Sequence, residues 1–176
     1  GFVHNSTASI GIVMFKGDDL SFGDLLKNAD VAMYQAKAAS RNTFRFFDPV
    51  MQAIAERRTQ LENALRQGLV QEEFVLNYQI QTNSNGKTTG VESLVRWINP
   101  EYATVSTGEF IALAEETDII FPLGQWVLET ACAQLAAWSQ HPTMSNWSMS
   151  VNVSALQFKK SSFVDNVKTA LEKSDA

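Results

Sequence analysis

Two segments with β propensity flank an Asn-Gly pair in the middle of the chain. They cover residues 74–81 and 87–97, and Thr82-Asn83-Ser84-Asn85-Gly86 separates them. Asn and Gly adopt positive φ more easily than other residues, so Asn-Gly between two such segments is a strong hairpin signal. The sequence therefore predicts an antiparallel strand pair at this point, and any fold of the chain has to contain it.

Strand and helix patterns alternate on both sides of this hairpin. The expected elements are strand 8–15, helix 24–39, strand 43–47, helix 53–67 with Gly68 as its stop, the hairpin, helices 106–116 and 122–138, strand 148–155 and helix 162–173. Apolar residues recur at helical spacing in the helices, and Ser106 with Glu109 has the spacing of a capping box. Such alternation predicts an α/β protein.

Composition limits the function classes that fit the chain. Its 176 residues are 45% hydrophobic with a formal net charge of −5, which suits one domain or two incomplete ones. No apolar run approaches the ~18 residues of a membrane span. Mild acidity argues against broad binding to nucleic acid or membranes and leaves room for a local basic pocket. Cys132 is alone, so we expect a core thiol in a reducing, cytoplasmic compartment.

The segment 91–97 carries the most chemical information. Side chains alternate along a strand, so Glu92, Leu94 and Arg96 are expected on one face. A carboxylate suits Mg²⁺ or Mn²⁺, and a guanidinium suits phosphate oxygens. The spacing alone favours the other interpretation, a structural ion pair. Asn152 is expected mid-strand and away from solvent, where its amide needs a hydrogen bond or a ligand.

Several motifs then follow one another in order along the chain. They are Tyr78-Gln79, Gly90-Val91-Glu92-Ser93-Leu94-Val95-Arg96-Trp97, Thr107-Gly108-Glu109-Phe110-Ile111, Leu113-Ala114-Glu115-Glu116, Trp126-Val127-Leu128, Val151-Asn152-Val153-Ser154-Ala155 and Gln157-Phe158. Together they resemble the N-terminal half of an EAL domain, the bacterial cyclic-di-GMP phosphodiesterase. Residues 7–47 resemble the C-terminal end of a GGDEF diguanylate cyclase domain, through Thr7-Ala8-Ser9-Ile10-Gly11-Ile12, the run from Ala29 to Lys37, and Arg41-Asn42.

The resemblance implies an arrangement of domains. Residues 1–48 are expected to be a strand-helix-strand remnant of a ferredoxin-like GGDEF domain, and residues 49–69 a linking helix. Residues 70–176 are expected to be the first half of a modified (β/α) barrel whose first strand is antiparallel. The chain has no initiating Met or secretion signal, so we expect both ends to lie inside a longer protein, in which any membrane tether would belong to upstream regions. Half a barrel leaves sheet edges exposed, and we expect self-association.

The resemblance also assigns roles to residues. It implies Glu92 and Asn152 as ligands of Mg²⁺ or Mn²⁺ that converge in one cavity beside the Arg96 guanidinium, and Gln79, Leu94 and Arg96 as substrate-binding residues. Lys37 and Arg41, four apart on one helical face, resemble phosphate-contacting residues of the GGDEF family. Ser93 replaces the central Ala of the EAL signature, and Ile80 replaces the Pro that usually follows Tyr-Gln.

The family chemistry is metal-dependent hydrolysis of cyclic-di-GMP to the linear dinucleotide. The remaining acidic ligands and an assisting Lys belong to the second half of the domain, beyond Ala176, so this chain alone, which has no catalytic base of its own, is expected to be inactive. Two alternatives stay open. The first is a degenerate EAL module that binds cyclic-di-GMP as a receptor without cleaving it, and the second is a structural half-domain used for contact with a partner.

Overall fold

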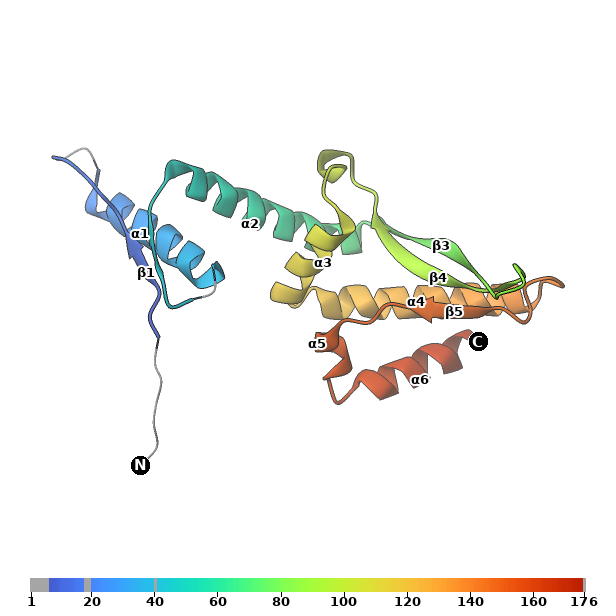
Figure 1. The fold of residues 1–176 in the computed structure, drawn as a ribbon. Helices are drawn as coiled ribbons and strands as arrows, with labels where there is room; N and C mark the ends of the chain where they lie inside the picture. The colour runs from blue at the N-terminus through green and yellow to red at the C-terminus, as the bar shows by residue number, and fades with distance from the viewer. Residues whose placement is uncertain (1–6, 18–19, 40, 176) are drawn as a thin grey trace, which may run out of the picture. The chain divides into compact units, whose positions relative to one another are not determined.

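A computed structural model of the chain describes residues 7–17, 20–39 and 41–175 (Figure 1). The chain divides into two compact units, residues 1–61 and residues 62–176. No helix in the described ranges combines the length and the apolar character that a membrane crossing requires. Each unit has a sheet of its own.

The first unit contains a strand, a helix and a second strand. Strand β1 (Ile10–Ile12) pairs in parallel with β2 (Phe44–Phe46), and helix α1 (Phe22–Ala38) connects them. The strand-helix-strand order expected from the sequence is confirmed, although β1 is shorter than the apolar run that predicted it. A Cβ on Gly11 would overlap the backbone of α1 at Ala29 and Met33, so the glycine allows the helix to lie close against β1.

Helix α1 ends earlier than the sequence pattern suggested. Ser21 caps its start by accepting a hydrogen bond from the Asp24 backbone, and its last residue is Ala38. Arg41 lies beyond the helix in the left-handed region with φ 57°. The prediction that Lys37 and Arg41 share one helical face is therefore wrong, because the chain leaves the helical conformation between them.

Helix α2 (Pro49–Val70) passes from the first unit into the second. It begins at Pro49, where the missing N–H of proline costs nothing, and not at residue 53. The expected stop at Gly68 is also wrong, because the helix continues to Val70 and Glu72 takes the left-handed conformation with φ 58°. A Cβ on Gly68 would lie 2.8 Å from Nε1 of Trp97, so this glycine serves close packing.

The second unit is built on a three-stranded sheet. Strand β3 (Phe74–Thr82) is antiparallel to β4 (Thr88–Trp97), and β4 is parallel to β5 (Ser148–Val151), which places β4 in the centre. The predicted hairpin is confirmed. The side chain of Asn83 accepts hydrogen bonds from the backbone of Asn85 and Lys87, each at 3.0 Å, and Gly86 has φ 76°.

Helices cover one face of this sheet. They are α3 (Thr107–Glu116), α4 (Ile120–Ser139) and α6 (Phe163–Ser174), with the short helices η1 (Pro100–Tyr102) and α5 (Ala155–Phe158) in the connections. Figure 1 shows α4 running along the sheet with α6 beside it. The core between the layers includes Phe110, Ile119 and Leu123, all at most 1% exposed. The sequence did not predict η1 or α5, and β5 ends at Val151 and not at residue 155.

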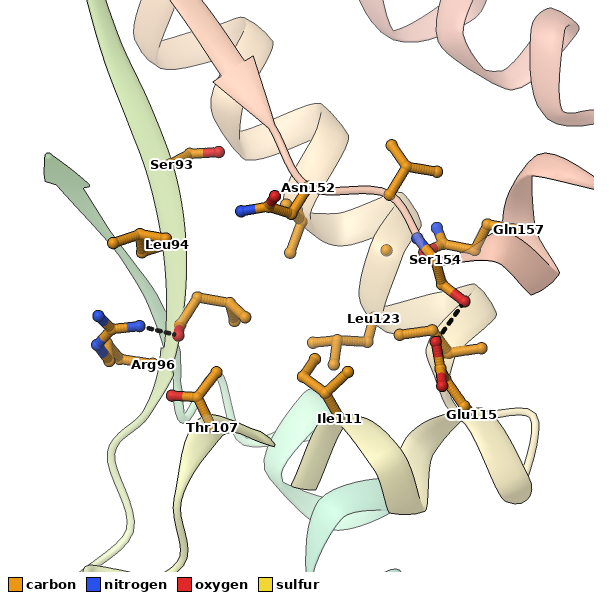
Figure 2. Close-up of a pocket in the computed structure, with 15 residues that line it drawn as sticks. Ser93, Leu94, Arg96, Thr107, Ile111, Glu115, Leu123, Asn152, Ser154 and Gln157 are labelled. Carbon is orange, nitrogen blue, oxygen red and sulfur yellow. Dashed lines mark hydrogen bonds between the residues drawn. The ribbon is translucent and has the colours of Figure 1, made fainter. Parts of the chain in front are cut away.

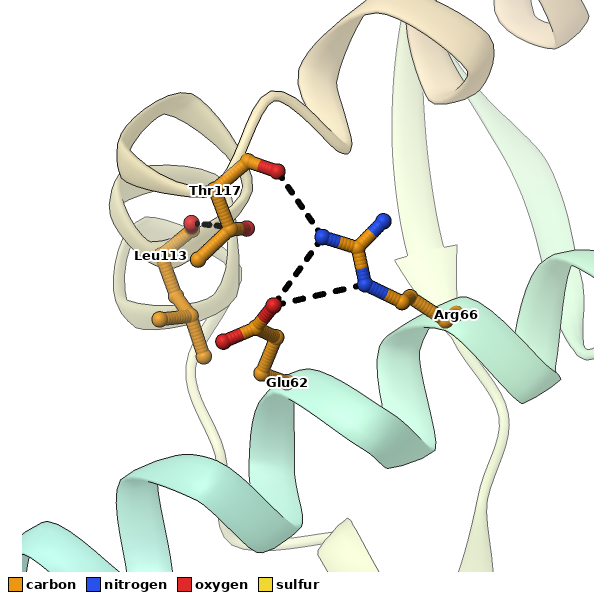
Figure 3. Close-up of polar contacts among 4 residues, drawn as sticks. All are labelled: Glu62, Arg66, Leu113 and Thr117. Carbon is orange, nitrogen blue, oxygen red and sulfur yellow. Dashed lines mark hydrogen bonds and ion pairs between the residues drawn. The ribbon is translucent and has the colours of Figure 1, made fainter.

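The second half of α2 is fastened to α3 inside the same unit. Figure 3 shows the Arg66 guanidinium between Glu62 and the last turn of α3. Arg66 donates to the Glu62 carboxylate at 2.9 Å and to the Thr117 carbonyl oxygen at 3.0 Å. Arg66 thus satisfies a carbonyl that the end of α3 leaves without a helical partner, and it holds the two helices together.

Candidate functional site

The three-stranded sheet separates its side chains into a covered face and an open face. Val91 and Ser93 are each 2% exposed and belong to the covered face, which packs against the helices. Glu92 lies between them in sequence and points to the opposite face, because strand residues alternate. The alternation that the sequence predicted for this strand therefore decides which of its residues stay accessible.

The open face carries four of the residues that the sequence predicted for the site. Gln79 on β3 and Ser150 on β5 are the direct neighbours of Glu92 across the sheet. Leu94 and Arg96 follow Glu92 along the same face of β4, and both are half-buried. Gln79 is exposed. The structure thus brings Gln79, Glu92, Leu94 and Arg96 together on one face, while Lys37 and Arg41 belong to the first unit.

Asn152 reaches Glu92 from the end of β5. Its Nδ2 donates a hydrogen bond of 2.7 Å to Oε1 of Glu92, which joins residues sixty positions apart. The predicted convergence of the acid and the amide is therefore confirmed. The expected mid-strand, solvent-avoiding position of Asn152 is wrong, because Asn152 follows the last residue of β5 and is exposed.

Arg96 has a local partner. Its Nη1 donates to the Val95 carbonyl oxygen at 2.8 Å, and this bond holds the guanidinium near the end of β4. Among the ion pairs of the described residues, none joins Glu92 to Arg96. The structural ion pair that the spacing favoured is therefore not formed. The Arg96 guanidinium still has N–H donors that could bind another acceptor.

The turn after Asn152 is held by three side chains that the sequence analysis did not single out. Ser154 donates to Oε1 of Glu115 at 2.6 Å and accepts from the Leu156 backbone at 3.1 Å. Oε1 of Gln157 accepts from the Ser154 backbone at 3.2 Å, which completes a capping box. The spacing of Ser154 and Gln157 in the sequence is the signal that would have revealed this cap.

A cavity of about 280 Å³ lies on the covered side of β4. Figure 2 shows Ile111 and Leu123 pointing into it, and Leu94 and Arg96 on β4 are also among its lining residues. Asn152, Ser154 and Glu115 border it, whereas Glu92 and Gln79 do not. Asn152 and Arg96 therefore line one cavity, as expected, whereas Glu92 lies outside it and meets Asn152 through the hydrogen bond between their side chains.

Two groups near the sheet have shifted pKa values. Burial raises the pKa of Tyr78, whose ring stands edge-on to Trp138 with 4.8 Å between centroids. Burial also raises the pKa of the Cys132 thiol, and a hydrogen bond with Ser174 partly opposes that shift. Both groups are therefore held in their neutral forms, and they serve packing beneath the covered face.

The described residues contain no group of three or more His, Cys, Asp or Glu side chains arranged to hold a metal ion. Glu92 and Asn152 are two oxygen-bearing side chains, and Mg²⁺ uses six oxygen ligands, several of them commonly waters. The pair could therefore supply at most two of the ligands of such an ion.

Comparison with known proteins agrees with this geometry. Residues 62–176 match the EAL domain, and residues 3–43 match the family described as diguanylate cyclase, GGDEF domain. The bifunctional diguanylate cyclase/cyclic di-GMP phosphodiesterase MucR of Pseudomonas aeruginosa is 42% identical over 94% of this chain and 24% of its own length. The cyclic di-GMP phosphodiesterase NbdA of the same organism is 36% identical over 94% of this chain and 21% of its own length.

Solved structures show the same fold. The MucR phosphodiesterase in complex with cyclic-di-GMP is 40% identical, with a TM-score of 0.61 over 66% of this chain and 47% of that one. The EAL enzyme Bd1971 in its cGMP-bound form is 32% identical, with a TM-score of 0.62 over 69% of this chain and 34% of that one. The predicted α/β class, with a GGDEF remnant followed by EAL barrel strands, is confirmed.

The chain belongs to the EAL domain family, and a GGDEF segment precedes its EAL region. It spans between about a fifth and a quarter of the length of the curated relatives named above.

Proposed function

We propose that this chain is part of a cyclic-di-GMP signalling protein whose EAL domain hydrolyses cyclic-di-GMP to the linear dinucleotide with a divalent metal. The hydrogen bond between Asn152 and Glu92 on the open sheet face carries the proposal, because it joins the two residues that the EAL resemblance names as metal ligands. The MucR and NbdA names, and the cyclic-di-GMP complex of MucR, support the substrate class.

The donor pair fits a hard cation. Neighbouring oxygen ligands of an octahedral Mg²⁺ lie about 3 Å apart, since each metal–oxygen distance is about 2.1 Å. The amide of Asn152 approaches the Glu92 carboxylate to 2.7 Å, so an amide turned to present its oxygen would offer a similar spacing. When bound, the metal would supply a polarised phosphate and an activated water.

The other residues of the open face would bind the dinucleotide. Arg96 would meet a phosphate with the donors that its bond to Val95 leaves free, and Gln79 and Leu94 would line the substrate surface around Glu92. In the GGDEF segment, Lys37 and Arg41 would contact phosphate as separate groups, because they do not share a helical face.

We place the parent in the bacterial cytoplasm on the strength of the same signalling role.

We also propose the division into residues 1–48, 49–69 and 70–176, in which the continuous helix α2 supports the middle segment as a link. Strands β3 and β5 are the edges of the sheet, and each has one side without a strand partner in the described part of the chain. Self-association through these edges is expected. Multi-angle light scattering should detect dimers or larger species, and a monomer at high concentration would contradict this.

Receptor function without hydrolysis is the second candidate. It is favoured for the chain by itself, because the described residues offer the metal only Glu92 and Asn152. The replacement Ile80 also points this way. It is 61% exposed beside Gln79, and it lacks the fixed φ that proline would give the strand at that point.

Titration calorimetry with cyclic-di-GMP and Mn²⁺ tests the proposal on the 176-residue chain. We expect measurable binding that Arg96→Ala weakens by about 10- to 100-fold, since hydrogen bonds to charged groups contribute about 1.5–3 kcal/mol. Arg57→Ala, at an exposed position of α2, is the matched control and should bind like the unmodified chain. Absence of binding, or equal loss in both variants, would contradict the proposal.

The same samples are then assayed for conversion of cyclic-di-GMP to the linear dinucleotide. We expect no turnover, because two side chains hold a catalytic metal too weakly. Turnover at the rate of an intact EAL domain would refute the inactivity of this chain, and it would leave the binding proposal standing.

A further inference from the structure

The connection between β5 and α5 is only three residues long and places Asn152 between two anchors. Before it, Val151 packs against the buried cluster of Leu128, Cys132 and Ala170. After it, Ser154 is the N-cap of α5. Asn152 itself is exposed, so its position depends on these neighbours and not on packing of its own side chain.

The anchor on the C-terminal side is a hydrogen-bonded clamp, made of Glu115, Ser154 and Gln157. The Ser154 hydroxyl donates to the Glu115 carboxylate on α3 at 2.6 Å, which is a short, charge-assisted bond. It also accepts from the Leu156 backbone at 3.1 Å. The Ser154 oxygen is thus held from two sides, by α3 and by the first turn of α5 (Figure 2).

Gln157 completes the clamp from inside the protein. It is 8% exposed, and its Oε1 accepts the Ser154 backbone N–H at 3.2 Å. A Cβ on Gly124 of α4 would overlap the Gln157 carboxamide, so the glycine provides the space in which that carboxamide lies. The Ser154 backbone is therefore fixed by a side chain whose own position depends on α4.

We propose that Glu115, Ser154 and Gln157 are positioning residues that hold the connection after β5 so that the Asn152 amide meets Glu92. None of the three makes the contact with Glu92 itself. Their effect on metal binding rests on the proposed function, whereas their effect on the hydrogen bond between Asn152 and Glu92 does not. Residues that orient metal ligands commonly change metal affinity by about 10- to 100-fold when they are replaced.

A pair of glycine substitutions tests the clamp. Gly124→Ala places a methyl group against the Gln157 carboxamide, while Gly108→Ala, also in a helix, places one in open space. The readout is the ¹⁵N-resolved side-chain amide signal of Asn152, assigned by its loss in Asn152→Asp. Glu92→Ala gives the signal of the unbonded amide. We expect Gly124→Ala to move the signal toward that reference and to speed its exchange with water, and Gly108→Ala to leave both unchanged.

A second pair separates hydrogen bonding from general packing. Glu115→Leu removes the acceptor of Ser154, and Glu115→Gln restores an acceptor without the charge. We expect Glu115→Leu to shift the Asn152 amide signal and Glu115→Gln to recover most of its original position. Glu109→Leu, at an exposed position of the same helix, is the control and should have no effect.

Mn²⁺ provides the link to function, because a bound paramagnetic ion broadens nearby signals. In the unmodified chain, Mn²⁺ should broaden the Asn152 amide signal, and Gly124→Ala should need about 10-fold more Mn²⁺ for the same broadening. Absence of broadening in the unmodified chain would reject the metal proposal and leave the amide shifts to decide the clamp.

An unchanged Asn152 signal in folded Gly124→Ala and Glu115→Leu would overturn the clamp. The clamp would also be overturned if both variants unfold while the controls Gly108→Ala and Glu109→Leu stay folded. Glu115, Ser154 and Gln157 would then determine the fold and not the position of the Asn152 side chain.

Discussion

The two faces of the sheet β3–β4–β5 consist of alternate residues of the same strands, yet their surroundings differ completely. On β4, Val91 and Ser93 are 2% exposed beneath the helices, and Glu92 between them faces the open side, where Asn152 reaches it. Hydrophobic burial constrains the residues of the covered face, whereas the residues of the open face are not packed beneath helices. The covered face therefore determines whether the unit folds, and the open face is the one for which we propose a binding role.

Leucine-to-alanine substitutions on the two faces should differ most in their effect on the free energy of unfolding. Leu123 is 1% exposed in α4, whereas Leu94 is half-buried on the open face. We expect Leu123→Ala to lower the free energy of unfolding by about 2–5 kcal/mol, because it removes buried methyl groups from the core. Leu94→Ala should cost less than about 1.5 kcal/mol. Urea unfolding measures both, and equal losses would refute the division of roles.

Gly90 belongs to the open face, but its replacement should still destabilise the fold. It lies opposite Ser148, and a Cβ there would overlap the Ser148 backbone, so the β4–β5 contact requires a glycine. Gly90→Ala is expected to cost about 1–3 kcal/mol through a forced backbone shift. Gly108→Ala, which meets open space, should cost nothing by comparison. An unfolding free energy equal to that of Gly108→Ala would show that the strands separate without penalty.

The same contrast explains which parts of the fold the sequence predicts. The alternation of side chains along a strand and the Asn85-Gly86 turn are local features, and they predicted the hairpin and the two faces of β4. Helix ends depend on tertiary contacts. Gly68 looked like a stop, but it is buried against Trp97, and α2 continues to Val70 until Glu72 adopts positive φ. Propensity contains no information about that packing.

The candidate site was predictable only in part, for a related reason. Alternation placed Glu92, Leu94 and Arg96 on one face, but the meeting of Glu92 with Asn152 depends on the parallel pairing of β4 with β5, which no local pattern encodes. The family resemblance supplied that link. The exposed position of Asn152 was missed because β5 ends at Val151, four residues before the predicted end of the strand, and Ser154 with Gln157 caps the start of α5 instead.

Removing the Glu92–Asn152 contact should have the smallest effect on stability of all these changes. The bond is exposed to solvent, so water replaces each lost partner, and we expect Glu92→Ala and Asn152→Ala to change the free energy of unfolding by no more than about 0.5 kcal/mol. If the open face is a binding face, the same substitutions abolish the Mn²⁺ effect on cyclic-di-GMP binding in calorimetry. Ser106→Ala, which removes an exposed cap of α3, is the control and should leave binding unchanged. A large loss of stability without any change in binding would make Glu92 and Asn152 structural residues, and the open face would then be no different in role from the covered one.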